Sequence, residues 1–107
     1  MIDKVFEALS STVRRKILAY LSATDLTAGE IAARFDISKP SISKHLALLE
    51  SAGLIEGEKK GQFVHYRLVR ANLANTLNGF VQEVCPVSRP LKKESQALAK
   101  AKPSERS

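Results

Sequence analysis

Residues 38–53 constrain the fold of this 107-residue chain more than any other stretch, because they have the marks of a short amphipathic helix with a defined start and stop. Ser38 is a favoured N-cap residue, and Pro40 is tolerated in a first turn. Gly53 supplies the left-handed residue that commonly ends a helix. One face is apolar, and the opposite face is small, polar and basic, with no carboxylate before Glu50. Such a face suits a helix that enters a DNA groove, so we interpret this stretch as a recognition helix.

Two short helices are expected at the beginning of the chain, over residues 2–9 and from about residue 13 to residue 22, because apolar residues recur there with a helical period. The run Arg14-Arg15-Lys16 falls in the first turn of the second helix, where the helix dipole disfavours cations. Either this run is a solvated basic face, or one of the arginines braces an acidic partner or a phosphate.

A third helix is predicted over roughly residues 28–35, after a connection formed by residues 23–26. Thr27 and Glu30 have the spacing of a capping box, in which each side chain satisfies a backbone amide of the first turn. Residues 36–38 then make a tight turn into the recognition helix. Two short helices joined in this way, the second one basic on its outer face, are typical of a helix-turn-helix.

A β-hairpin wing is predicted after the recognition helix. Residues 54–56 begin one strand, residues 57–61 are rich in turn formers and carry Lys59 and Lys60 at the tip, and residues 62–68 have strand composition. Alternation places two sets of side chains on opposite sides of the second strand, namely Phe63, His65 and Arg67 against Val64, Tyr66 and Leu68. The fold class is therefore mainly α, an α+β winged helix-turn-helix with about five helices and a two-stranded wing.

A last helix is expected over residues 71–84, and its apolar stripe is long for a helix that only caps a small core. Pro86 ends it, and the domain is expected to span residues 1–85. Residues 86–107 are predicted to be a flexible basic tail. The chain has 17 basic and 11 acidic residues and a pI near 9.7, which makes a polyanionic partner plausible, although the tail supplies much of the excess charge.

Several classes of protein are disfavoured by what the sequence lacks. One cysteine, Cys85, excludes an internal disulfide; it is either a small residue at a helix end or a partner for its copy in a dimer. His45, His65 and Cys85 fall on three separate elements, so we expect no metal and no other cofactor. No nucleophile–base arrangement or glycine-rich phosphate loop indicates an enzyme. With no apolar run of about 18 residues and no signal peptide, cytoplasmic localisation is expected.

Several separated blocks resemble the ArsR/SmtB family of winged helix-turn-helix repressors, closest to its SdpR-like autorepressor branch, over about residues 4–82. The blocks common to the family are residues 6–9, 14–18, 41–46 and 52–55, and those nearer the branch are residues 26–32, 35–43 and 60–63.

The resemblance implies a homodimer, built on the first and last helices, that represses transcription at a (pseudo)palindromic operator in double-stranded DNA. It also implies control of the protein's own gene, and no small-molecule substrate is expected. The metal-sensing members carry ligands in the third or last helix that are missing here. In the SdpR-like branch, a membrane protein relieves repression by sequestering the repressor.

The candidate site residues follow from these assignments. His45 either packs at the edge of the core or binds a phosphate, and Arg67 either braces the wing or contacts the DNA backbone. The DNA-binding candidates are Ser38, Lys39, Ser41, Ser43, Lys44, His45, Lys59, Lys60, Gln62 and Arg67. The dimer-interface candidates are Ile2, Val5, Phe6, Leu73, Leu77, Phe80, Val81 and Val84. Two alternatives stay open: an effector- or redox-gated sensor, and a winged-helix module that binds a protein instead of DNA.

Overall fold

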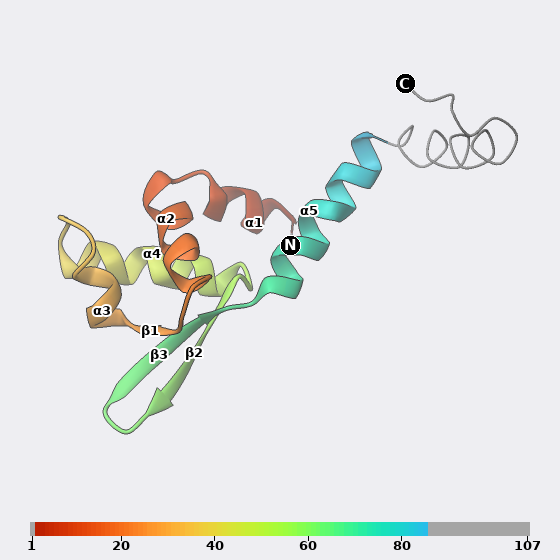
Figure 1. Ribbon diagram of the computed structural model, residues 1–107. Helices are drawn as coiled ribbons and strands as arrows, with labels where there is room; N and C mark the ends of the chain where they lie inside the picture. The colour runs from red at the N-terminus through yellow and green to blue at the C-terminus, as the bar shows by residue number, and fades with distance from the viewer. Residues whose placement is uncertain (1, 86–107) are drawn as a thin grey trace, which may run out of the picture. The chain divides into compact units, whose positions relative to one another are not determined.

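The computed structural model describes residues 2–85, which form five helices and one three-stranded sheet (Figure 1). The predicted tail, residues 86–107, lies outside the described residues. The chain divides into two units between Ala74 and Asn75. The elements in order are α1 (Ile2–Leu9), α2 (Thr12–Leu21), β1 (Leu26–Thr27), α3 (Ala28–Ala32), α4 (Lys39–Ser51), β2 (Ile55–Lys60), β3 (Phe63–Leu68) and α5 (Arg70–Val84).

The expected helices are present, and the helix predicted from residues 38–53 is confirmed as α4. Its N-cap is Ser38, and Gly53, just beyond its end, has the left-handed conformation that the sequence predicts, with a φ of 77°. The third helix is shorter than expected, because α3 ends at Ala32 instead of reaching Phe35. Beyond it the amides of Arg34 and Phe35 bond to carbonyls three residues back, which tightens the chain into turns.

The sheet differs from the predicted two-stranded wing in two ways. Leu26, the last residue of the expected connection, and Thr27, the predicted cap of the third helix, form β1 and pair with β3, giving the order β1-β3-β2. The predicted turn over residues 57–61 is wrong as well, because β2 continues through Lys60. Gly57 lies inside the strand opposite Tyr66, where a Cβ atom would come within 3.0 Å of the Tyr66 ring.

The turn of the wing is the two-residue loop Gly61-Gln62. Gly61 has a φ of 64°, and no residue other than glycine has a positive φ among the described residues. A positive φ at the first turn position alone is the pattern of a type II′ hairpin turn, in which glycine is favoured. The alternation predicted for residues 63–68 is seen near the core, where Tyr66 and Leu68 pack against it and Arg67 between them is exposed.

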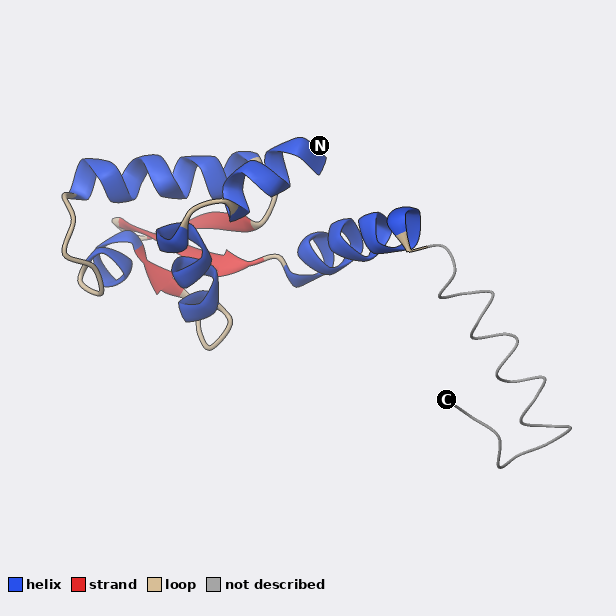
Figure 2. Cartoon of the chain, turned by 90° about the horizontal axis from the view of Figure 1, so that it is seen from above, coloured by secondary structure: helices blue, strands red, loops and turns tan. Residues whose placement is uncertain are grey.

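The core lies within the first unit, where its helices gather around the three strands (Figure 2). The predicted apolar face of α4 is confirmed, because Ile42, Leu46 and Leu49 are all buried. The other buried apolar residues are Val5, Ala8, Ile17, Leu18, Leu21, Leu26, Ile31, Leu54 and Ile55. Burial of one face of α4 leaves its opposite face outward, and so the core fixes which residues α4 can present to a ligand.

Candidate nucleic-acid interface

The first turn of α4 is organised by Ser38. Its Oγ accepts a hydrogen bond from the Ser41 amide at 3.3 Å and donates one to the Ser41 Oγ at 3.0 Å. Ser38 therefore serves the helix itself, while the proton of the Ser41 hydroxyl has no acceptor among the described residues. Ser41, Ser43 and Lys44 are the candidates for contacts with base edges; Ser41 is half-buried, and Ser43 and Lys44 are exposed further along the helix.

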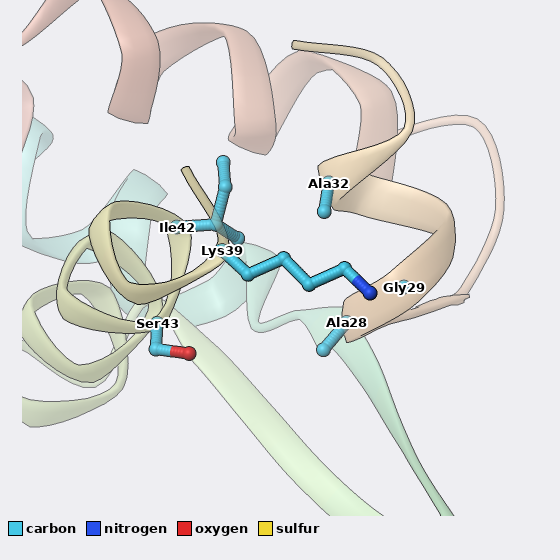
Figure 3. Close-up of a pocket in the computed structure, with 6 residues that line it drawn as sticks. All are labelled: Ala28, Gly29, Ala32, Lys39, Ile42 and Ser43. Carbon is cyan, nitrogen blue, oxygen red and sulfur yellow. The ribbon is translucent and has the colours of Figure 1, made fainter. Parts of the chain in front are cut away.

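A recess of about 200 Å³ lies between α3 and the start of α4 (Figure 3). Its lining is mostly of small residues, and the side chain of Lys39 runs from α4 toward α3 at its mouth. The lining residues are Ala28, Gly29, Ala32, Lys39, Ile42 and Ser43. The Lys39 ammonium group and the Ser43 hydroxyl thus border a recess that is large enough to hold part of a polar ligand.

A second, more open recess of about 560 Å³ lies on the other side of α3, toward β3. Its lining residues are Thr27, Gly29, Glu30, Ala33, Phe63 and His65. Gly29 borders both recesses, so it lies between the recognition helix and the wing. From the sequence, Gly29 is only a member of the capping box. The sequence signal that could have pointed to a functional role for Gly29 is the presence of glycine at a helical position, where alanine would form a more stable helix.

The predicted capping box at α3 is confirmed. The Thr27 amide donates to Glu30 Oε1 at 2.8 Å, and the Glu30 amide donates to Thr27 Oγ1 at 3.1 Å. The hydrogen bond from the Thr27 amide is the main reason why the pKa of Glu30 lies below its ordinary value. Because this carboxylate stays ionised at the second recess, a phosphate is more compatible with the first recess, which Lys39 borders.

The basic residues of the wing lie on opposite faces of the hairpin and do not form one paired tip. Lys59 is opposite Val64, and Lys60 is opposite Phe63, at the last pair before the turn. Gln62 is exposed at the turn, and Phe63 is 55% exposed beside it. The two cations therefore flank the hairpin, so that a ligand reaching the wing meets positive charge on either side.

Arg67 braces the wing, one of the two roles considered for it. Its Nε donates to Glu56 Oε1 at 2.9 Å, its Nη2 contacts the same oxygen, and the two residues are directly opposite in the β2–β3 register. The carboxylate raises the pKa of Arg67 further above its usual range. Both side chains are more than half exposed, so the pair contributes little to stability.

Arg14 is neither solvated nor placed for a phosphate, so both predictions for the basic run are wrong at this residue. Its guanidinium is buried and donates to the carbonyls of Glu7 and Ala8 at the C-terminal end of α1, where a helix dipole favours a cation. Its third contact, at 3.0 Å, is with Nδ1 of His45. His45 is half-buried at the edge of the core, and burial, followed by the charge of Arg14, lowers its pKa.

The dimer-interface candidates divide between the core and the surface. Val5 is buried in the core of its own chain, which corrects its assignment to the interface, and Leu73 packs partly against the same core. The remaining candidates are half-buried or exposed: Ile2, Phe6, Leu77, Phe80, Val81 and Val84. Within α5, exposure rises toward the C-terminal end and reaches 57% at Val84.

Residues 2–85 contain neither a membrane-spanning helix nor a ready-made metal site. No helix in this part of the chain has the length and apolar character needed to cross a membrane. No three His, Cys, Asp or Glu side chains in it are grouped so that they could hold a metal ion. Cys85 is exposed at the end of this range.

Comparison with known proteins gives consistent matches. A family model described as a helix-turn-helix domain matches residues 9–58. The transcriptional repressor SdpR of Bacillus subtilis (strain 168) is 48% identical over 77 residues, which cover 72% of this chain and 86% of SdpR. The arsenical resistance operon repressor of Escherichia coli (strain K12) is 39% identical over 66 residues, covering 61% of this chain and 56% of the relative.

Solved structures extend the match to the fold. The structure of an ArsR-like transcriptional regulator from Rhodococcus sp. RHA1 aligns with a TM-score of 0.73 and 33% identity, over 90% of this chain and 91% of the other. These relatives are transcription regulators and not enzymes. The helix-turn-helix, the wing and the matches agree: the chain belongs to the ArsR/SmtB-type family of winged helix-turn-helix repressors and is close to SdpR.

Proposed function

We propose that this protein represses transcription as a homodimer that binds a (pseudo)palindromic operator in double-stranded DNA, including the operator of its own gene. The observation that carries the proposal is the exposed face of α4, which is basic, has no carboxylate before Glu50 and adjoins a recess bordered by Lys39 and Ser43. Relatives that are named repressors support it.

We assign direct contacts with base edges to Ser43 and Lys44, since both are exposed on the outward face of α4. Lys39 contacts a phosphate at the start of the helix. Ser41, expected from the sequence to contact a base, is half-buried there, and we assign it to a phosphate as well. Lys59, Lys60 and Gln62 hold the DNA backbone beside them. Each protomer covers only a few base pairs, so two copies of α4 must bind in adjacent major grooves to specify an operator.

The dimer is proposed to form through α1 and α5. The residues offered for this interface are Ile2, Phe6, Leu77, Phe80, Val81 and Val84, which are half-buried or exposed in the single chain. Because a two-fold axis relates the protomers, the same residues serve on both partners. We place the dimer in the cytoplasm, and by analogy with the SdpR-like branch, a membrane protein that sequesters it would relieve repression.

The direct test is binding to DNA from immediately upstream of its own gene, compared with scrambled DNA of the same composition. Wild-type protein should prefer the upstream fragment, and Ser43→Ala and Lys44→Ala should lose that preference. Glu83→Ala, on α5, is a control that leaves the α4 face unchanged. If Lys44→Ala binds the upstream fragment and the scrambled fragment with the same affinities as wild type, the assignment of the recognition face is wrong.

A further inference from the structure

Arg14 is the one charged side chain that is buried among residues 2–85, and it joins three helices. It belongs to α2, its Nε and Nη2 donate to carbonyls of α1 at 2.8 and 2.9 Å, and its Nη1 lies 3.0 Å from Nδ1 of His45 on α4. Each of these contacts of the guanidinium is with a hydrogen-bond acceptor, and one of these acceptors lies on the recognition helix.

The contact with His45 fixes which ring nitrogen carries the proton. A guanidinium is a donor only and stays charged, so Nδ1 of His45 must be the acceptor and must have no proton. The ring is therefore neutral with its proton on Nε2. A protonated ring would bring a second N–H against the guanidinium, and the lowered pKa of His45 agrees with this conclusion.

The Nε2–H group faces solvent. In the part of the chain that the structure describes, no buried side-chain nitrogen or oxygen lacks a hydrogen-bond partner. Nε2 makes no hydrogen bond with the protein there, so it must reach the surface. His45 lies one helical turn from Ser41 and next to Lys44, on a helix whose outward face holds the proposed DNA contacts.

We propose that Arg14 is a positioning residue for DNA binding, because it holds His45 as the Nε2–H tautomer and directs that proton to a backbone phosphate of the DNA. A phosphate is the expected acceptor because His45 lies at the apolar edge of α4, away from the face assigned to base contacts. The inference rests on the proposed function. It also links α1, part of the proposed dimer interface, to the recognition helix through one side chain.

The test uses two substitutions that each keep one half of the ring's hydrogen bonding. His45→Asn keeps an acceptor near the Nδ1 position and removes the outer donor. His45→Gln can place an N–H near the Nε2 position and loses the inner acceptor. A hydrogen bond to a charged group is worth about tenfold or more in affinity, so His45→Asn should weaken binding to the upstream DNA by that factor. His45→Gln should lie closer to wild type.

The salt dependence of DNA binding gives a second readout, because loss of a charged lysine would change the slope of this dependence. Neutral His45 releases no counterion, so His45→Asn should lower affinity at every salt concentration without changing the slope of log K against log salt. Arg14→Lys should also weaken binding, whereas Arg15→Lys, whose wild-type side chain donates to Leu9 O and Thr12 Oγ1 and not to His45, should not.

The tautomer is measured on wild-type protein, so the inference is testable even if a variant fails to fold. Nitrogen-15 NMR at pH 7 should show His45 protonated at Nε2 and unprotonated at Nδ1. A proton on Nδ1, or wild-type affinity for folded His45→Asn, would overturn the inference while leaving the repressor assignment intact. Wild-type protein without preference for the upstream DNA would instead overturn the proposed function, and this inference with it.

Discussion

Replacing Gly29 with alanine should stabilise the fold and weaken DNA binding at the same time. A Cβ atom at this position meets nothing nearer than Thr27 Oγ1 at 4.0 Å, and the backbone there is helical. Glycine in a helix costs about 0.5–1 kcal/mol relative to alanine, so Gly29→Ala should gain that amount. For a domain of this size the gain corresponds to an increase in Tm of about 2–8 °C. Thermal unfolding at fixed protein concentration measures it, since dimerisation makes Tm depend on concentration.

The effect on binding has the opposite sign because Gly29 borders the recesses on both sides of α3. A DNA strand that passes from α4 to the wing would cross Gly29, and a methyl group there would hold the strand away. The loss of one phosphate contact corresponds to about a tenfold weaker affinity, measured by fluorescence anisotropy on the upstream fragment. Gly29→Ala with a raised Tm and unchanged affinity would refute this path for the DNA.

Gly53→Ala is a matched control that should destabilise the fold, whereas Gly29→Ala should stabilise it. The φ of Gly53 is 77°, and a Cβ atom there would lie 3.4 Å from Asn72 Nδ2, so this variant should lose about 1 kcal/mol. A lower Tm for Gly29→Ala would show that the space beside Gly29 is not open as described.

Three further outcomes follow from the same contacts. Thr27→Ala should destabilise the fold by about 1 kcal/mol in urea unfolding, while Thr27→Ser retains the cap; equal stability of the two variants would contradict the capping role. Lys59→Ala and Lys60→Ala should each reduce the slope of log K against log salt for DNA binding by about 0.9. The control Gln62→Ala should leave this slope unchanged. An unchanged slope in the two lysine variants would exclude phosphate contacts by the lysines of the wing. The pKa of His45 is lowered in the folded protein, so on acidification the imidazole is protonated more readily in the unfolded chain. The stabilisation that neutral His45 gives the fold should therefore be complete above pH 6.5, the ordinary pKa, and should be lost as the pH falls through the pKa of the folded protein. In His45→Asn the contribution of this group to the pH dependence should be absent.

The parts of the fold that depend on local pattern could be predicted from the sequence. The periodic apolar residues of α4, with Ser38 before it and Gly53 after it, were sufficient to place that helix. The capping box was predictable because both of its partners lie within one turn. These features depend only on residues that are close together in the chain.

The features that the sequence did not predict depend on distant partners. β1 is two residues long, too short to show a period, and exists because β3 pairs with it. Gly57 resembles a turn residue, but it is required by the ring of Tyr66 across the strands. The burial of Arg14 depends on carbonyls of α1 and on His45, which is 31 residues away, and no pattern in the run Arg14-Arg15-Lys16 distinguishes its first member.

The central claim, that two copies of α4 bind one symmetric operator, is tested most directly by selecting bound sequences from a pool of random DNA duplexes. Such a selection works whichever genes the protein regulates. We expect an enriched inverted repeat whose half-sites are about 10 base pairs apart from centre to centre, the spacing of one DNA turn. An enriched motif without two-fold symmetry, or no enriched motif at all, would contradict the account.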